Sequence, residues 1–265
     1  MSIVIPAYNE ATRLPQAIPQ IVDYCRKREY QFELIVVDDG SQDDTATVAG
    51  RLGKRYPGVK VIRLHPNRGK GGAVKAGMIK ATRDLVLFTD ADQSTPIKEL
   101  DKLLPWLKSG KVEIAIGSRA VAGSKVIHGQ TGWRQAAARG FDLLDKLFLV
   151  WGVKDTQCGF KLFTRKSARE LFPKVTSKTA IFDMELLLLA ARAGYRIAEV
   201  PVTWTHNPDT RIPYNFKKSL FIFRELLRIK HRWKVIWPVH IKTYRGLFRT
   251  DRSHGLSGSG GFFDK

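Results

Sequence analysis

Short apolar runs alternate with longer amphipathic stretches over the first 118 residues of the chain. The runs are apolar throughout, which is the pattern of strands buried on both faces, whereas the stretches repeat apolar positions every three or four residues, as helices do. The predicted strands are SIVIP, FELIVV, VKVIRL, DLVLF and EIAIG, and the predicted helices span 12–28, 43–56, 71–82 and 97–108. This regular alternation predicts an α/β fold with a mostly parallel sheet flanked by helices.

The alternation changes after residue 119. A loop with glycines, AGSKVIHGQTG, leads into a predicted helix over 133–150, and the segments that follow are DTQCGFKLF, a helix around FDMELLLLAARAG and the strand IAEVPVTW. An irregular stretch then precedes a long helix over 214–231 and a basic tail that ends in GLSGSGG. The pattern divides the chain into a main domain, 1–210, with halves at 1–118 and 119–210, and a C-terminal segment, 211–265.

The composition indicates a globular protein that attracts polyanions. Of 265 residues, 43% are apolar, which suffices for a core, and 45 Lys and Arg against 25 Asp and Glu give a net charge of +20. This excess suits nucleic acid, anionic lipid or phosphorylated ligands. Cys25 and Cys158 lack the spacing of a disulfide framework or a zinc site, and no apolar run approaches the ~20 residues that cross a bilayer. We therefore expect a protein of the cytoplasmic side, without a transmembrane helix, that meets any membrane at its surface.

Polar and acidic residues directly follow four of the predicted strands. PAYNE follows the first strand, DDGSQDD the second, DADQ the fourth and GSR the fifth. Ligands of open α/β sheets bind beyond the carboxyl ends of the strands. We therefore expect these groups to converge on one binding edge.

Asp90 and Asp92 follow the strand DLVLF and have two interpretations. Two carboxylates at a strand end can surround one hard cation, Mg²⁺ or Mn²⁺, which would bridge the phosphates of a nucleotide diphosphate. Alternatively, the acids cap the helix predicted after Pro96. We favour the metal, because Ser94 or Thr95 is expected to supply that cap.

Two further strand ends suggest nucleotide contacts. Asp39 is expected to accept a hydrogen bond from a ribose or base, while Ser41 or Asp43 caps the next helix. Tyr8 offers a stacking surface and Glu10 a ribose partner, although PAYNE suits a plain turn equally well.

The segment NRGKGGAVKAG, 67–77, places glycines and cations before a predicted helix. The amides of the helix start, together with Arg68 and Lys70, would suit a diphosphate. The segment lacks the order of a Walker loop, and a glycine turn with a solvated basic face is an equal alternative.

Eight motifs together resemble one enzyme family. In chain order they are SIVIPAYNE, LIVVDDGS, NRGKGGAVKAG, FTDADQSTP, AIGSRA, DTQCGFKLF, FDMELL and EVPVTW. This order is similar to that of the family 2 glycosyltransferases that load a sugar onto a polyprenyl phosphate, most closely those that glucosylate dolichyl phosphate, over about residues 1–205. The resemblance implies a GT-A fold, a nucleotide-binding half (1–118), a sugar and acceptor half (119–210), and inverting transfer from a nucleotide sugar such as UDP-glucose.

The resemblance also implies roles for individual residues. It gives the nucleoside to Pro6, Tyr8, Glu10, Val37 and Asp39, and the metal and diphosphate to Asp90, Ala91, Asp92 and Gln93. Arg119 falls on an arginine that contacts phosphates or sugar, and Asp155 and Gln157 on residues that line the sugar and acceptor side. Arg211 lies near the position of a phosphate-binding lysine, but the chain reads THNPDTR where the family carries a GSK-type element. The N-terminal membrane helix of eukaryotic members is also absent from this sequence.

The predicted C-terminal helix is amphipathic, basic and aromatic. Its apolar positions are Phe216, Leu220, Phe223 and Leu227, its basic ones Lys217, Arg224 and Arg228, and Trp233 and Trp237 follow. Such a helix suits the headgroup region of a membrane. The alternative is a helix packed on the domain with a solvated basic side.

We therefore expect a peripheral membrane enzyme that transfers glucose or another hexose to polyprenyl phosphate. A lipid phosphate with a second pKa of about 6 is already ionised at neutral pH, so the transfer needs little help from a base. The alternatives are a mannosyltransferase that uses GDP-mannose, a transferase with a soluble or polysaccharide acceptor, and a nucleic-acid-binding protein. The last is disfavoured because the acidic strand ends would repel a phosphate backbone and no nucleic-acid-binding signature is present.

Overall fold

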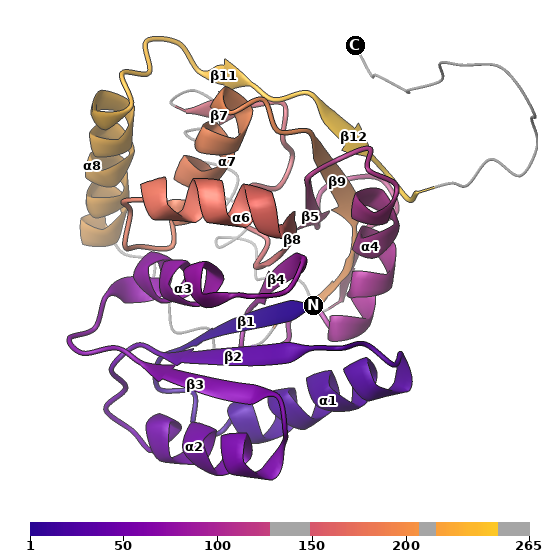
Figure 1. Ribbon diagram of the computed structural model, residues 1–265. Coiled ribbons are helices and arrows are strands. Elements are labelled where there is room, and N and C mark those ends of the chain that lie inside the picture. The colour runs from indigo at the N-terminus through magenta and orange to yellow at the C-terminus, as the bar shows by residue number, and fades with distance from the viewer. Residues whose placement is uncertain (128–148, 207–215, 249–265) are drawn as a thin grey trace, which may run out of the picture.

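The computed structural model describes residues 1–127, 149–206 and 216–248, with only the backbone of 216–220 and 222 (Figure 1). In these ranges eight strands form one sheet in the order β12-β9-β5-β8-β4-β1-β2-β3. All neighbours are parallel except β8, which runs antiparallel to β4 and β5. The strands are β1 (Ser2–Ala7), β2 (Glu33–Asp38), β3 (Val59–Arg63), β4 (Leu85–Thr89), β5 (Ile114–Ser118), β8 (Phe160–Thr164), β9 (Ile197–Pro201) and β12 (Thr243–Arg245).

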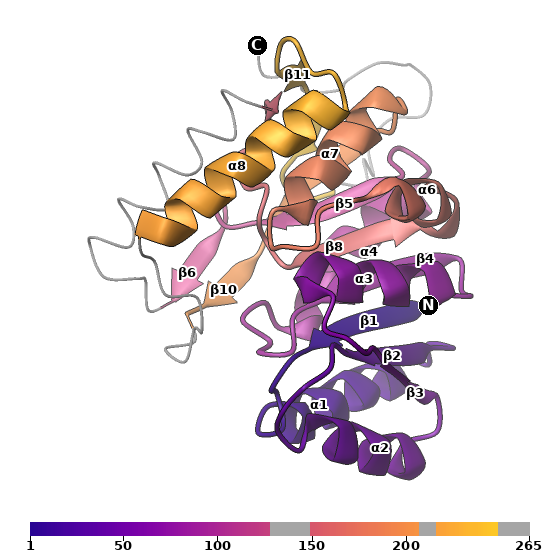
Figure 2. The same cartoon turned by 90° about the vertical axis from the view of Figure 1, so that its left-hand side faces the viewer.

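Helices cover both faces of this sheet (Figures 1 and 2). Ile3 and Ile5 of β1 face one apolar cluster and Val4 faces the other, as the alternation of side chains along a strand requires. One face carries α1 (Leu14–Lys27), α2 (Thr45–Arg55) and α4 (Leu100–Lys108), and the other carries α3 (Gly69–Lys80), α6 (Arg165–Leu171), α7 (Phe182–Arg192) and α8 (Phe216–Arg232). The predicted α/β sheet flanked by helices is confirmed.

Some elements differ from the prediction. The strand β8 and the helix α6 were not predicted, and the segment IAEVPVTW divides into β9 and β10 (Thr203–Thr205). It divides because β10 leaves the main sheet and pairs with β6 (Lys125–Ile127). Most of the helix predicted over 133–150 lies outside the described residues, and its end is instead the strand β7 (Val150–Trp151).

The chain after α8 returns to the domain. The strand β11 (Val239–His240) pairs with β7, and β12 pairs with β9 at the edge of the main sheet. Leu226 and Ile229 of α8 are 0% and 2% exposed in the core cluster on the α7 side. The core therefore continues past residue 210, and the functional division of the chain there stays a prediction.

The predicted apolar stripe of α8 is only partly described. The side chains of Phe216, Lys217 and Leu220 lie outside the described part of the structure. Of the other two positions, Phe223 is half-buried and Leu227 is exposed. The side of α8 that packs on the domain is the one that carries Leu226 and Ile229.

Glu33 at the start of β2 joins three segments at the edge opposite the strand ends. Its buried carboxylate accepts hydrogen bonds from Ser2 Oγ (2.6 Å), Thr82 N (2.7 Å) and Thr82 Oγ1 (2.8 Å), and pairs with Lys60 Nζ at 2.8 Å. Burial alone would raise the pKa of Glu33, but the hydrogen bonds from Lys60, Ser2 and Thr82 lower it to about 2. The ionised carboxylate therefore stabilises the fold.

We expect Glu33→Gln to lower the free energy of unfolding at pH 7 by about 1–3 kcal/mol, because it leaves buried donors without their charged acceptor. In the unchanged protein this contribution is complete above pH 4.5, the ordinary pKa, and is lost as the pH falls towards about 2. Urea unfolding at several pH values from 7 to 3 measures both effects. Asp23→Asn, at an exposed position of α1, is the control, and equal stability of Glu33→Gln and wild type would contradict the account.

Candidate active site

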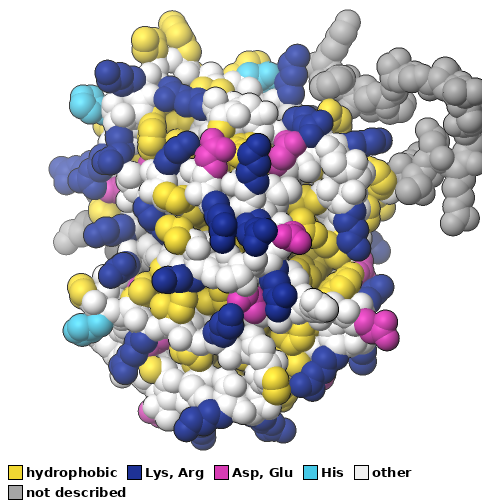
Figure 3. All heavy atoms as spheres, viewed as in Figure 1, with side chains coloured by type: hydrophobic (Ala, Val, Ile, Leu, Met, Phe, Trp, Pro, Cys, Tyr) yellow, Lys and Arg dark blue, Asp and Glu magenta, His cyan; other side chains and the backbone are white. Residues whose placement is uncertain are grey.

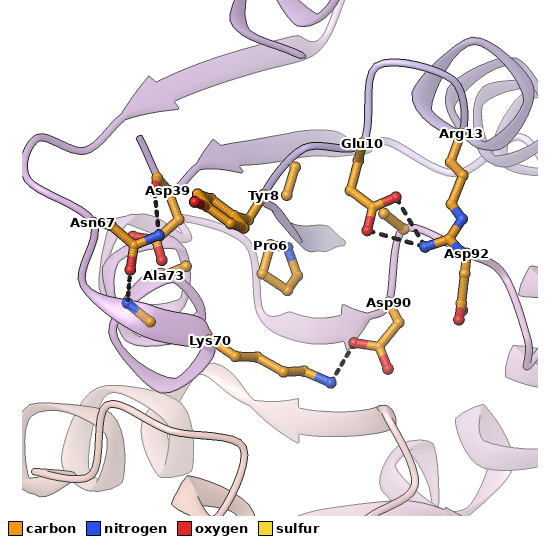
Figure 4. A pocket seen from close by; sticks show the side chains of 13 residues that line it. Pro6, Tyr8, Glu10, Arg13, Asp39, Asn67, Lys70, Ala73, Asp90 and Asp92 are labelled. Carbon is orange, nitrogen blue, oxygen red and sulfur yellow. Dashed lines mark hydrogen bonds and ion pairs between the residues drawn. The ribbon is translucent and has the colours of Figure 1, made fainter. Parts of the chain in front are cut away.

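The carboxyl ends of β1, β2 and β4 open on a cavity of about 480 Å³ (Figure 4). Three of the four predicted strand ends, PAYNE, DDGSQDD and DADQ, line it together with the segment NRGKG, whereas GSR after β5 does not. The predicted site residues among them are Pro6, Tyr8, Glu10, Asp39, Lys70, Asp90, Ala91 and Asp92.

Hydrogen bonds lock the PAYNE turn to the loop after β2. Asn9 N donates to Ser41 Oγ at 2.9 Å, and Glu10 N donates to Thr45 Oγ1 at 2.7 Å. Tyr8 lies on the same turn, with 41% of its surface exposed at the cavity. The turn is thus held in one place by its neighbour, and the ring of Tyr8 is presented as a fixed, open surface.

Asp39 faces the cavity from the end of β2 and is 2% exposed. Its Oδ1 accepts a hydrogen bond from Arg68 N at 2.8 Å. Burial raises the pKa of Asp39, although backbone amides of the next loop oppose this. The turn at the start of α2 is made by Asp43, whose Oδ1 accepts from Thr45 N at 3.0 Å. Asp43 therefore forms a turn before the helix, but the expected cap is wrong, because the N-cap residue of α2 is Asp44 and it has no side-chain cap. Asp39 takes no part in this turn and is placed at the cavity.

Asp90 and Lys70 form an ion pair across the cavity (Figure 4). The distance from Lys70 Nζ to Asp90 Oδ1 is 2.8 Å, and about a third of each side chain is exposed. Burial alone would lower the pKa of Lys70, but the carboxylates of Asp90, Asp183 and Asp92 outweigh it and raise the pKa. Lys70 is therefore a fixed positive charge at this strand end.

The cap expected from Ser94 or Thr95 is wrong. The 3-10 turn Ile97–Glu99 begins after Pro96 without a side-chain cap. Instead, Asp92 Oδ1 accepts a hydrogen bond from Ser94 N at 2.9 Å. One oxygen of Asp92 therefore stabilises the local turn, while the side chain still lines the cavity, as does that of Arg13 (Figure 4).

The glycines that begin α3 serve packing. Gly71 N donates to Lys178 O at 3.0 Å, and a Cβ on Gly69 would lie 2.2 Å from the same oxygen. A Cβ on Gly71 would lie 2.3 Å from Ser177 O. The expectation that the amides of this helix start bind a diphosphate is therefore wrong for Gly71, because the neighbouring segment already takes that amide. Asn67, Gly69, Lys70 and Ala73 of the motif line the cavity, and Lys70 brings a charged side chain to it.

Gly159 brings a second loop against Asp90. A Cβ on Gly159 would lie 1.9 Å from Asp90 Oδ2, so only glycine lets the main chain come this close to the carboxylate. The contact follows from the sheet register, because Phe160 of β8 pairs with Thr89 of β4. The DTQCG loop thus ends beside Asp90, which lines the cavity.

The other end of that loop holds Arg119. Arg119 N and Nε donate to Asp155 Oδ2 at 2.8 and 2.7 Å, and Nη2 donates to Asp155 Oδ1 at 2.8 Å. The guanidinium carbon also lies 5.4 Å from the ring centre of Trp204. Burial alone would raise the pKa of Asp155, but Arg119 outweighs it and holds the pKa low. Asp155 N in turn donates to the buried Glu199 at 2.8 Å. Asp155 and Trp204 therefore hold Arg119 from two sides at the carboxyl end of β5, outside the lining of the cavity.

The remaining predicted residues are placed differently. The Val37 side chain is fully buried in the core and does not line the cavity. Gln93 is not among the residues that line the cavity; its Nε2 donates to Asp90 O at 3.0 Å, and its buried Oε1 has no hydrogen-bond partner among the described residues. Gln157 N donates to Asp155 Oδ1 at 3.3 Å. Arg211 lies outside the described residues.

Sequence reasoning missed three charged residues near the site. Arg13 lines the cavity, and its Nη1 lies 3.1 Å from both carboxylate oxygens of Glu10. Its position three residues after Glu10 at a helix start was a usable signal. Below the DTQCG loop, Lys161 is fully buried and donates to Asp183 Oδ1 at 2.7 Å. The signal there was a lysine within the apolar run FKLF.

Comparison with known proteins identifies the class. Residues 2–172 match glycosyl transferase family 2, and the chain belongs to this family. The protein is therefore a glycosyltransferase. Several relatives bear the name dolichyl-phosphate beta-glucosyltransferase. The one from Drosophila melanogaster is 39% identical over 247 residues, covering 89% of this chain and 76% of the relative, and the one from Homo sapiens is 36% identical, covering 88% and 75%.

Solved structures confirm the GT-A fold. Mycobacterium tuberculosis glucosyl-3-phosphoglycerate synthase, determined with Mn²⁺ and UDP-glucose, has a TM-score of 0.61 at 18% identity and covers 90% of this chain and 86% of its own. A mannosyltransferase of Pyrobaculum calidifontis, determined with GDP-Man and Mn²⁺, has a TM-score of 0.57 at 22% identity and covers 88% and 63%. At these identities the likeness is one of fold.

We expect Gly159→Ala to reduce glycosyl transfer by roughly 10- to 100-fold, because the added methyl group must displace Asp90 or the loop by about 1 Å. The measurement is the initial rate of transfer together with circular dichroism. Gly50→Ala is the matched control, because nothing lies within 4 Å of a Cβ there. Transfer by Gly159→Ala at the rate of this control would contradict the positioning of Asp90 by Gly159.

Proposed function

We propose that the protein transfers glucose from UDP-glucose to dolichyl phosphate or another polyprenyl phosphate, with inversion at the sugar carbon. The relatives named dolichyl-phosphate beta-glucosyltransferase support this choice of sugar and acceptor. The observation that carries the proposal is a pair of fixed cations at one sheet edge, Lys70 on Asp90 and Arg119 on Asp155. The reaction brings two anionic phosphate groups together, and each requires a positive partner.

The donor is proposed to bind in the cavity, in the half formed by residues 1–118. Tyr8 would stack on the base, and Asp39 and Glu10 would accept hydrogen bonds from the nucleoside. Pro6 and Ala91 would line the same wall, and only the main chain of Val37 could take part. Lys70 would bind the diphosphate, because its charge already points into the cavity.

The residues present fit a divalent ion, Mg²⁺ or Mn²⁺. Asp90 and Asp92 offer carboxylate oxygens at the cavity, and the buried Oε1 of Gln93 has no partner among the described residues. No group of three or more His, Cys, Asp or Glu suited to a metal occurs in the described part of the chain. Two carboxylates completed by substrate phosphates are a common site for Mg²⁺. The ion would stabilise the negative charge on the departing diphosphate.

The acceptor is proposed to approach from the half formed by residues 119–210. Its phosphate is ionised at neutral pH, so no side chain has to remove a proton before the attack. Arg119 would attract this phosphate, held in place by Asp155 and Trp204. Gln157, and Arg211 from outside the described residues, are proposed to contact the sugar or the acceptor.

A lipid acceptor implies work at a membrane surface, and we propose a peripheral enzyme of the cytoplasmic side. A search of the described helices finds none with the length and apolar character of a membrane span. The C-terminal segment 211–265 is proposed to supply the contact with lipid.

We expect the purified protein to transfer label from UDP-[¹⁴C]glucose to a short-chain polyprenyl phosphate, with the product recovered in the organic phase. EDTA should stop the reaction and Mg²⁺ or Mn²⁺ should restore it. Asp92→Asn should reduce the rate at least about a hundredfold, because it removes a charge that holds the ion. Parallel reactions contain GDP-mannose or a soluble acceptor.

The arms of this assay separate the alternatives. Label from GDP-mannose but not from UDP-glucose would make the protein a mannosyltransferase, and label that stays in the aqueous phase would contradict a lipid acceptor. Full activity of Asp92→Asn would contradict the metal assignment.

We expect Lys70→Met to bind Mn²⁺ more tightly than wild type in the absence of nucleotide, because Lys70 pairs with the carboxylate of Asp90 that would hold the ion. The same variant should bind UDP roughly tenfold more weakly, because a charged partner of the diphosphate is gone. Electron paramagnetic resonance of free Mn²⁺ and calorimetry with UDP measure the two affinities.

The control is Lys80→Met, which removes a lysine from the exposed far end of α3. If Lys70→Met weakened Mn²⁺ binding, or left UDP binding at the level of this control, the proposed exchange of Lys70 between Asp90 and the diphosphate would be wrong.

A further inference from the structure

The segment between α8 and β11 exposes two adjacent large apolar side chains. Ile236 is 78% exposed and Trp237 is 81% exposed, the highest values for large apolar residues in the described chain. Figure 3 shows hydrophobic side chains protruding at the top of the molecule, over the region of this segment. An apolar pair held this far into water indicates a binding surface.

The base of this segment is anchored in the domain. Trp233 Nε1 donates to Glu185 Oε1 at 2.7 Å, and Glu185 is fully buried. Val235 is 4% exposed, and its amide donates to Lys230 O at 2.9 Å. The bonds fix the turn after α8, so Ile236 and Trp237 are presented outward by a built support.

Cations surround the exposed pair. Leu227, Lys230, His231, Lys234, Val235 and Ile236 line a shallow groove of about 440 Å³ beside it. Residues 226–248 contain no Asp or Glu, and their cations are Arg228, Lys230, Arg232, Lys234, Lys242 and Arg245. Arg228 pairs with Glu225 and Arg245 with Glu199, whereas Lys230 and Lys234 line the groove beside Ile236. The surface therefore combines an apolar projection with neighbouring lysines.

We propose that this surface, the α8 tip (Lys230, His231, Lys234, Ile236 and Trp237), docks the enzyme on anionic lipid. Trp237 and Ile236 enter the headgroup region, where an aromatic ring with a polar edge is stable, and the lysines meet lipid phosphates. The choice of a lipid partner rests on the proposed function, because a polyprenyl phosphate acceptor lies in a membrane. The exposure and charge of the tip do not depend on that function.

The tip changes which part of the C-terminal segment is expected to meet the membrane. The face of α8 that carries Leu226 and Ile229 is buried against the domain, so it cannot contact lipid. The exposed apolar positions described on the helix are Phe221 and Leu227, at 50% and 42%. Of these two, Leu227 lines the groove beside Ile236, so it extends the apolar surface of the tip onto the last turns of the helix.

The test compares full-length wild type with Ile236→Ser/Trp237→Ser in sedimentation with vesicles. The vesicles are phosphatidylcholine alone or with about one third phosphatidylserine. The control, Val61→Ser/Ile79→Ser, removes two exposed apolar side chains from β3 and α3. We expect the tip variant to bind anionic vesicles at least about tenfold more weakly than wild type, and the control variant to bind them as wild type does. Wild type should bind neutral vesicles more weakly than anionic ones.

A second measurement places Trp237 in the bilayer directly. Brominated lipids quench tryptophan fluorescence at short range. Vesicles of such lipids should therefore quench the fluorescence of wild type more than that of Trp237→Phe, a variant that keeps an aromatic side chain at the tip. Transfer to a water-soluble, short-chain polyprenyl phosphate should be unchanged in the tip variant, which shows that it folds.

These results separate the tip from the proposed function. The proposal that the α8 tip docks on lipid would be overturned if the tip variant bound vesicles as tightly as wild type. It would also be overturned if the fluorescence of Trp237→Phe were quenched as much as that of wild type. Equal binding of wild type to neutral and anionic vesicles would also overturn the proposal. So would a tip variant that binds vesicles as wild type does but has lost dimerisation or DNA binding. If wild type failed to glycosylate any lipid but its vesicle binding still required Ile236 and Trp237, the proposed function would be wrong, whereas the docking of the α8 tip on lipid would be confirmed.

Discussion

The contact between the Gly159 main chain and the Asp90 carboxylate fixes how the site is assembled. It exists because β8 lies antiparallel between β4 and β5, so β8 begins at the edge where its neighbours end. The loop before β8 must therefore cross the carboxyl ends of the parallel strands. One end of this loop lies against Asp90, and the other carries Asp155, which clamps Arg119. A single reversed strand thus brings the Asp90 side of the site, where we propose that the donor binds, next to the Arg119 side, where we propose that the acceptor binds.

Pairing with cations explains why a chain with a net charge of +20 keeps acids at this edge. A buried or half-buried carboxylate is costly unless a cation or hydrogen bond compensates it. Lys70 compensates Asp90, Arg119 compensates Asp155, and Lys161 compensates Asp183. The acids in turn fix the direction of the cations. In the proposed transfer an acceptor phosphate attacks the sugar carbon while the nucleoside diphosphate leaves, and cations held in fixed positions near these two anions need no reorganisation when charge develops.

The sequence was sufficient to predict the local parts of this architecture. The first five strands, the α/β class and the gathering of Tyr8, Asp39, Asp90 and Asp92 at one edge follow from apolar periodicity and polar strand ends. The errors arose where tertiary contacts decide. The glycines before α3 suggested a phosphate site, but a distant segment at Lys178 takes the Gly71 amide. The strands β8 and β12 were missed because they are short runs that carry a charge. In FKLF of β8 the charge is Lys161, and it is tolerated in the interior only because Asp183, far along the chain, pairs with it.

The account depends on the claim that the edge formed by β1, β2 and β4 binds a nucleoside diphosphate together with a divalent ion. A crystal structure of the protein grown with UDP and Mn²⁺ tests this most directly. The account predicts the ion on carboxylate oxygens of Asp90 and Asp92 and on the diphosphate, with the uracil beside Tyr8. A nucleotide bound elsewhere on the molecule, or an ion that contacts neither aspartate, would contradict it.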